Sequence, residues 1–265
     1  MDLPARPSQQ IQMELFPGDR IVGKRSGEYS CFLFSGSIIN LEQGITVAHA
    51  LDDQSDIDIQ LQFDSARSVH DRIVGKCRKT FENLQRQGGG RLTADLALLK
   101  LNTTRCSVGN TVWWPFRGEN TAFQIRIYRG QEIPADTEVI ILDRNGHFQS
   151  GYIRSTHLTD VRIEALEGGM HNVLGICAEN NTDASADTQN NIVAVTDKGD
   201  SGALVMSVPS GQSNVLYVYG IVVGTYKFGE NESESFTVAN SLFEVIDEIS
   251  QHLLPVGYAH DIDFA

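Results

Sequence analysis

Ser201 lies in a glycine-rich segment, Gly199-Asp-Ser-Gly-Ala, of a kind that can make a serine hydroxyl reactive. This hydroxyl is a weak nucleophile until a base takes its proton and hydrogen-bond donors stabilise the oxyanion that forms. Gly199 can adopt a backbone conformation that aims its N–H, with that of Ser201, into one small space. The charge of Asp200 needs a buried partner, so this residue could pin the loop. The alternative is a tight glycine-rich turn without chemistry.

His49 and Asp95 are candidates for the base that would activate a serine and for the carboxylate that would hold this base. His49 ends the apolar run Gly-Ile-Thr-Val-Ala-His, with an alanine on either side that leaves room around the ring. Asp95 begins Asp-Leu-Ala-Leu-Leu-Lys-Leu, an apolar segment where a carboxylate without a partner would be costly. Taken alone, His49 also fits a satisfied residue at a strand end, and Asp95 fits a turn residue or strand cap.

Short apolar segments separated by turn signals predict an all-β protein that positions these residues. The predicted strands are residues 31–34, 37–41, 45–49, 57–63, 95–101, 139–142, 173–177, 203–206, 216–223 and 236–238. The polar segment 180–191 predicts a loop ahead of Ser201.

One helix is predicted at the end of the chain. Ser241 and Glu244 have the spacing of a capping box, and Pro255 ends the helix. Its apolar stripe consists of Leu242, Val245, Ile246, Ile249 and Leu253.

The charge of the chain restricts its partners. Its 265 residues include 21 Lys and Arg against 34 Asp and Glu, a net charge of −13. A surface this acidic repels phosphates and anionic lipids, which argues against nucleic acid and membranes as partners. We also expect no metal and no cofactor, because the sequence has no C-x-x-C pattern and no cysteine paired with histidine at metal-ligand spacing.

The cysteines and the N-terminal residues predict an intracellular, cytoplasmic protein. Cys31, Cys77, Cys106 and Cys177 are widely spaced, which suits reduced thiols in a chain of this size. The first twenty residues contain no apolar run of signal-peptide length, and no stretch is long enough to span a bilayer.

Several segments in register resemble the signature segments of chymotrypsin-like serine proteases. They are Gly36-Ser-Ile-Ile, Ile45-Thr-Val-Ala-His-Ala, Asp95-Leu-Ala-Leu-Leu-Lys-Leu and Gly199-Asp-Ser-Gly-Ala. Their order, His then Asp then Ser, and their spacing suit that family. Gly220-Ile-Val-Val resembles the family's strand that binds substrate backbone, and the helix from Ser241 resembles its C-terminal helix. The resemblance spans roughly residues 20–254.

The resemblance implies two antiparallel six-stranded β-barrels with the active site between them. An irregular arm would cover residues 1–19, the first barrel residues 20–115, and the second barrel with the C-terminal helix residues 116–265. His49 and Asp95 would come from the first barrel and Ser201 from the second. The backbone N–H groups of Gly199 and Ser201 would form the oxyanion hole, and the substrate would be a protein or peptide.

The chain departs from the family pattern at three positions. Ala50 and Asp197 stand where secreted members have disulfide-forming cysteines, which agrees with an intracellular enzyme. Val223 stands where the family has a serine that steadies the triad aspartate, so we expect Asp95 to be held differently.

Arg20-Ile-Val-Gly resembles the family's activation site, at which cleavage frees an amine that pairs with the aspartate before the nucleophile. Ile21 lies only 15 residues before Gly36, which is short for that role. We therefore favour an ordinary strand at residues 21–23, with Asp200 finding another partner. Cleavage after Arg20 is the alternative.

The resemblance also places a substrate pocket. Its residues would be Val195, Thr196, Lys198, Val223, Gly224, Thr225 and Glu234. Val195 at the base does not support trypsin-like selectivity, whereas Glu234 from the opposite side would favour Lys or Arg. Lys198 would lie at the rim. An exposed carboxylate in an acidic loop is the alternative for Glu234.

The sequence thus predicts a serine endopeptidase. The alternative is a binding or scaffold module on the same fold whose triad is catalytically silent. An α/β-hydrolase is disfavoured, because that fold needs Gly-x-Ser-x-Gly and the order Ser, Asp, His, and the chain has neither.

Overall fold

The computed structural model describes about three fifths of the chain. The described residues are 13–15, 20–23, 29–32, 34–35, 43–51, 56–59, 73–85, 91–102, 104, 106–109, 111–116, 119–130, 132–143, 147–163, 166, 169–178, 192–197, 199–208, 214–229 and 234–246. The predicted strand at 37–41, the predicted loop at 180–191 and Lys198 lie outside these residues.

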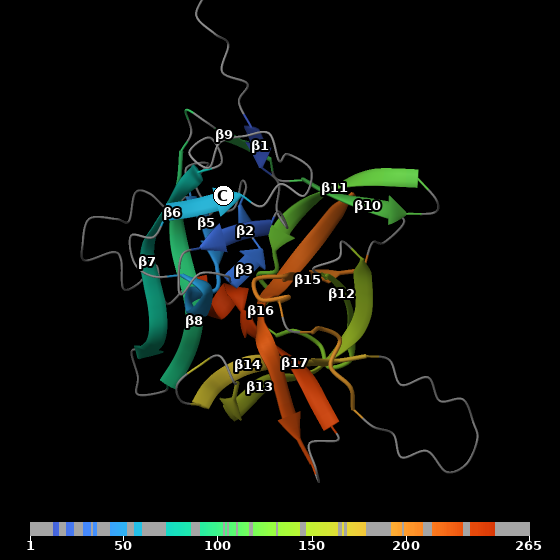
Figure 1. Cartoon of the computed structure of the whole chain (residues 1–265). Coiled ribbons are helices and arrows are strands. Elements are labelled where there is room, and N and C mark those ends of the chain that lie inside the picture. The colour runs from blue at the N-terminus through green and yellow to red at the C-terminus, as the bar shows by residue number, and fades with distance from the viewer. Residues whose placement is uncertain are drawn as a thin grey trace, which may run out of the picture.

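The first barrel is a seven-stranded sheet that closes on itself, drawn in blue to blue-green in Figure 1. Its order is β3-β2-β6-β7-β8-β5-β4, and all neighbours are antiparallel. The strands are β2 (Arg20–Gly23), β3 (Tyr29–Phe32), β4 (Phe34–Ser35), β5 (Gln43–Thr46), β6 (Asp56–Ile59), β7 (Ile73–Gln85) and β8 (Arg91–Leu101). The two outermost strands, β3 and β4, are one residue apart in the chain, so together they serve as the sixth strand of a closed ring.

The second barrel is closed by its last strand. The order β12-β13-β14-β17-β16-β15 returns to β12, and every pairing in this ring is antiparallel. The strands are β12 (Thr137–Leu142), β13 (Phe148–Arg162), β14 (Gly169–Cys177), β15 (Leu204–Ser207), β16 (Val215–Phe228) and β17 (Glu234–Ser241). The predicted all-β fold of the chymotrypsin-like type, with its two barrels, is therefore confirmed.

Two further strand pairs accompany the barrels. β10 (Thr111–Phe116) and β11 (Glu119–Ile127) form a hairpin, and β11 lies parallel to the first residues of β16. β1 (Met13–Leu15) and β9 (Cys106–Val108) form a short parallel pair. The domain boundaries at residues 19 and 115 stay a prediction.

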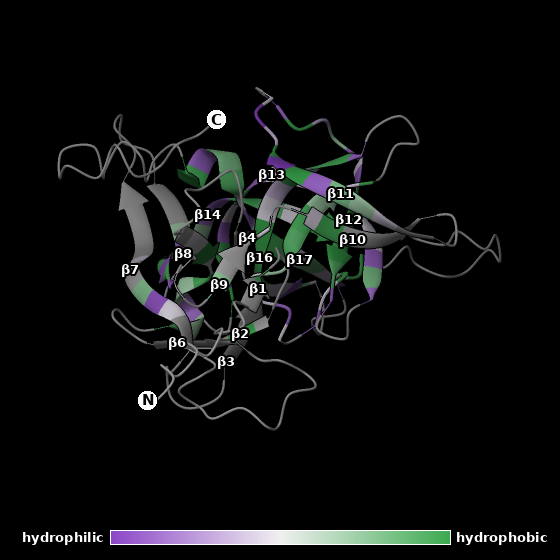
Figure 2. Ribbon diagram, turned by 90° about the horizontal axis from the view of Figure 1, so that it is seen from above, coloured by the Kyte–Doolittle hydropathy of each residue, from purple (hydrophilic) through white to green (hydrophobic). Residues whose placement is uncertain are grey.

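Alternation along the strands builds one core inside the second barrel and another that continues between the barrels. On β12, Val139 and Ile141 pack inside the second barrel, whereas Ile140 between them joins the larger cluster that contains Leu99 of β8 and Ile221 of β16. Figure 2 shows hydrophobic residues gathered where β12, β16 and β17 lie together. Side chains on one face of the strand thus bury apolar surface inside the second barrel, and those on the other face bury it in the cluster that continues between the barrels.

The structure confirms the start of the predicted C-terminal helix, because residues 242–246 are helical. Leu242, Val245 and Ile246 of the predicted stripe are buried, while Phe243 on the other face is 40% exposed. Ile249, Leu253 and Pro255 lie outside the described residues. Within the described ranges, no helix is long and apolar enough to cross a membrane.

Two predicted strand boundaries are wrong, and both concern candidate site residues. The strand predicted at 45–49 ends at Thr46, and a 3₁₀ turn (Ala48–Ala50) follows. Asp95 does not begin its strand, because β8 starts at Arg91. Apolar runs predict which residues are buried but not the point at which buried backbone leaves the extended conformation.

We expect the thiols of Cys77, Cys106 and Cys177 to be inert in the folded protein, because all three side chains are buried. Burial also raises the pKa of the Cys106 thiol, which lowers the fraction of reactive thiolate. An alkylating reagent followed by peptide mass spectrometry should find them unmodified in buffer and modified in denaturant. Rapid alkylation in buffer would contradict this burial.

Candidate active site

His49 lies on the 3₁₀ turn Ala48–Ala50, directly after β5. Its two alanine neighbours are almost fully buried, and the His49 side chain is 7% exposed. The turn re-directs the chain after β5 and brings both the backbone N–H and the ring of His49 to the same carboxylate.

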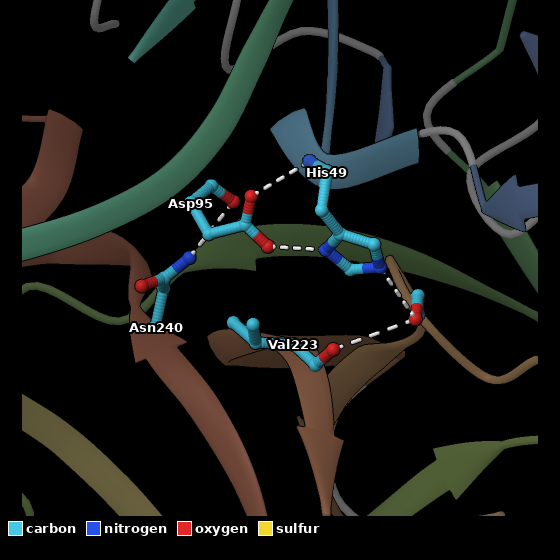
Figure 3. Close-up of polar contacts among 5 residues, drawn as sticks. His49, Asp95, Val223 and Asn240 are labelled. Atoms are coloured by element: carbon cyan, nitrogen blue, oxygen red, sulfur yellow. Dashed lines mark hydrogen bonds and ion pairs between the residues drawn. The ribbon is translucent and has the colours of Figure 1, made fainter. Parts of the chain in front are cut away.

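That carboxylate belongs to Asp95, which is 1% exposed on β8. One oxygen, Oδ1, accepts the backbone N–H of His49 at 2.8 Å, and the other, Oδ2, lies 2.6 Å from His49 Nδ1 (Figure 3). An ionised carboxylate only accepts hydrogen bonds, so in the neutral imidazole the ring proton resides on Nδ1. The second ring nitrogen, Nε2, is therefore an acceptor.

Ser201 lies next to this acceptor. Its Oγ is 3.1 Å from His49 Nε2, although the two residues are 152 positions apart in the chain. The same Oγ lies 3.4 Å from the carbonyl oxygen of Val223 on β16. The fold thus brings the predicted carboxylate, imidazole and hydroxyl into one hydrogen-bonded series that crosses from the first barrel to the second.

The turn around Ser201 depends on glycine at two positions. Gly199 has φ = 101° and Gly202 has φ = 85°, both in the region that side-chain-bearing residues rarely adopt. The Gly202 N–H donates to the carbonyl oxygen of Val222 at 2.8 Å, which fixes the turn against β16. For the N–H groups of Gly199 and Ser201, no acceptor is found among the described residues.

Asp200 has its partner within its own loop. This residue is 2% exposed, and its Oδ2 accepts the backbone N–H of Asp197 at 2.8 Å. Ile21, the residue that cleavage after Arg20 would make N-terminal, is fully buried in β2 between β3 and β6. Residues 21–23 are therefore part of an ordinary strand, as predicted.

The segment before Ser201 is held against β17 by buried hydroxyl groups. Thr237 Oγ1 accepts the backbone N–H groups of Val195 and Thr196 at 2.9 and 3.0 Å. The Thr225 hydroxyl on β16 donates to the carbonyl oxygen of Thr196 at 3.2 Å. These contacts bring three predicted pocket residues together with Thr237, which the sequence analysis did not single out.

The remaining predicted pocket residues are spread along the barrel. Val195 packs against the hydrophobic cluster of the second barrel. Val223 is buried, Gly224 packs close to Ile163, and Glu234 begins β17 opposite Phe228.

Beside Ser201, one edge of β16 has no partner strand among the described residues. β15 pairs with β16 as far as Ile221, and the N–H of Val222 donates to the carbonyl oxygen of Ala203. From Gly224 to Tyr226, β17 is the only described strand that pairs with β16. An unpaired strand edge is a template for an extended peptide.

The described residues include no group of three or more His, Cys, Asp or Glu side chains that could hold a metal ion. The hydrogen bonds of Asp95, His49 and Ser201 support proton transfer from a serine hydroxyl to an imidazole whose other nitrogen is held by a buried carboxylate.

The double barrel is the fold of chymotrypsin-like serine proteases. Thermobifida fusca protease A matches with a TM-score of 0.52 and 15% identity, over 89% of this chain and 96% of that chain. The Nocardiopsis protease NAPase matches with a TM-score of 0.52 and 14% identity, over 88% of this chain and 95% of that chain. Cellulomonas bogoriensis chymotrypsin matches with a TM-score of 0.52 and 12% identity, over 89% of this chain and 96% of that chain. No protein-family model and no curated protein matches the sequence.

We expect the intact chain to react at Ser201 without cleavage after Arg20, because Asp200 is already satisfied by Asp197 and Ile21 is buried. A fluorophosphonate, which phosphonylates activated serine hydroxyls, should label Arg20→Gln protein at the wild-type rate. Intact-mass spectrometry would show the adduct on the uncleaved chain. Labelling that appears only on a chain beginning at Ile21 would refute this expectation.

Proposed function

We propose that this chain is a serine endopeptidase that hydrolyses peptide bonds through an acyl-enzyme intermediate. The observation that carries the proposal is the hydrogen-bonded series from Asp95 through His49 to the Ser201 hydroxyl. Ser201 is the proposed nucleophile and His49 the general base, while Asp95 holds the imidazole in the reactive tautomer.

The proposed reaction follows from the hydrogen-bond directions. His49 Nε2 takes the proton of Ser201 as Oγ attacks the peptide carbonyl, and then gives it to the leaving amine. Asp95 stabilises the positive imidazolium between these two transfers. The N–H groups of Gly199 and Ser201 are the proposed donors to the oxyanion, and one such donor lowers a barrier by roughly 3 kcal/mol. Water then repeats the sequence on the acyl-enzyme.

A protein or peptide in extended conformation is the proposed substrate. It would pair with the edge of β16 from Val223 to Tyr226, which begins beside Ser201 Oγ. The proposed pocket for the side chain before the cut comprises Val195, Thr196, Val223, Gly224 and Thr225, with Lys198 at the rim and Glu234 opposite. The net charge of −13 favours neutral or basic peptides over nucleic acid. An intracellular location remains part of this proposal.

Replacing the Ser201 hydroxyl should abolish peptide hydrolysis and leave the fold intact. We expect Ser201→Ala to lower kcat by roughly 10⁴- to 10⁶-fold and to change the free energy of unfolding by less than about 0.5 kcal/mol. Cleavage of a peptide library and denaturant unfolding measure the two effects. Ser150→Ala, an exposed serine on β13, is the matched control and should behave as wild type. Turnover retained by Ser201→Ala would rule out the nucleophile assignment.

The second candidate is a catalytically silent module, favoured by the alternative acceptor that the Val223 carbonyl offers to the Ser201 hydroxyl. A fluorophosphonate separates the two candidates. The endopeptidase predicts rapid labelling of Ser201 in the wild type and labelling slowed by several powers of ten in His49→Ala, because the base is lost. A folded wild-type protein that is not labelled would favour the silent module.

A further inference from the structure

Asn240 connects the second barrel to the residue that holds His49. This residue lies near the end of β17 and is 1% exposed. Its Nδ2 donates to the backbone carbonyl oxygen of Asp95 at 3.1 Å, across 145 positions of sequence (Figure 3). Because the partner is a carbonyl oxygen, the atom of the amide that faces it must be the nitrogen.

No described residue of the second barrel donates a hydrogen bond to the Asp95 carboxylate. Both of its oxygens accept hydrogen bonds from His49. Val223 of β16, which stands where the family has a serine that steadies the aspartate, has an apolar side chain that cannot donate one. The contact from the second barrel is instead made to the Asp95 backbone. This contact lies beyond the end of β5, because β5 pairs with β8 only from Ala97 to Lys100.

Burying the Asn240 side chain lowers the stability of the fold in a way that its hydrogen bond to Asp95 does not offset. Its Oδ1 is buried and has no hydrogen-bond partner among the described residues. A buried polar atom without a partner lowers stability, and an apolar residue of similar size would avoid this loss. The amide therefore fits a role in geometry better than a role in stability.

We propose that Asn240 is a positioning residue that fixes Asp95, and through it His49, relative to Ser201. The inference rests on the proposed endopeptidase function. Ser201 belongs to the second barrel while His49 and Asp95 belong to the first, so the 3.1 Å contact between Oγ and Nε2 depends on how the barrels dock. The amide of Asn240 holds them together at Asp95 through a directional bond, whereas apolar packing alone is non-directional.

The test is Asn240→Leu, which keeps the approximate volume and removes both the donor and the unpaired oxygen. We expect kcat to fall roughly 10- to 100-fold because the reacting groups are misplaced, with KM close to the wild-type value. The melting temperature should fall modestly, because the buried Asp95 carbonyl oxygen loses its donor while the unpaired Asn240 oxygen is also removed. The proton between His49 Nδ1 and Asp95 Oδ2, which a short hydrogen bond shifts far downfield in an NMR spectrum, should move upfield or broaden.

The matched control is Ser241→Ala, which alters the next buried polar residue of β17 and leaves the Asn240 amide in place. This variant should keep the wild-type kcat and the wild-type downfield resonance even if its stability falls. If Asn240→Leu does not fold, Asn240→Ala, which only removes atoms, gives the same readouts.

Wild-type kcat together with an unchanged downfield resonance in the folded variant would overturn the proposal. A loss of kcat of equal size in Ser241→Ala would also overturn it, because the effect would then be general to this end of β17. The NMR readout needs no turnover. If wild-type protein proves unreactive, the endopeptidase assignment fails, while the resonance still shows whether Asn240 positions Asp95.

Discussion

The buried carboxylate of Asp95 is the constraint on which the site depends. A charge this deep in the protein is tolerated only when its oxygens accept good hydrogen bonds, and removing a partner from a buried pair costs about 3–5 kcal/mol. His49 supplies both donors, one from its backbone and one from its ring. The need to satisfy Asp95 therefore fixes the imidazole in position and selects its tautomer, leaving Nε2 directed at Ser201.

Much of this arrangement can be predicted from the sequence, because the residues with chemical function lie in short segments with unusual local patterns. Three such patterns can be recognised in the sequence alone: a histidine between two alanines, an aspartate in an apolar strand, and a serine between glycines. Their assembly rests on the resemblance, which supplied the two-barrel fold and hence the proximity of residues up to 152 positions apart. The strands β7 and β13 were missed because their charged and polar residues hide the alternation.

Asn240 and Thr237 were not predicted, for a different physical reason. Each acts by hydrogen-bonding backbone atoms of a segment more than 40 positions away. Backbone atoms are the same in every residue, so the sequence holds no complementary side chain that could reveal such a contact. The only local signal is a polar residue inside an otherwise apolar strand end, which is equally typical of a residue that faces solvent.

The last described strand affects the order in which the fold can form. β17 pairs with both β14 and β16, so the second barrel has no closed ring until residues 234–241 are available. During synthesis the ribosome releases this strand after every other described strand, and long-range pairings of this kind form late. A nascent chain therefore carries its histidine, aspartate and serine without a barrel to assemble them. The three side chains therefore come together only once residues 234–241 have paired with β14 and β16.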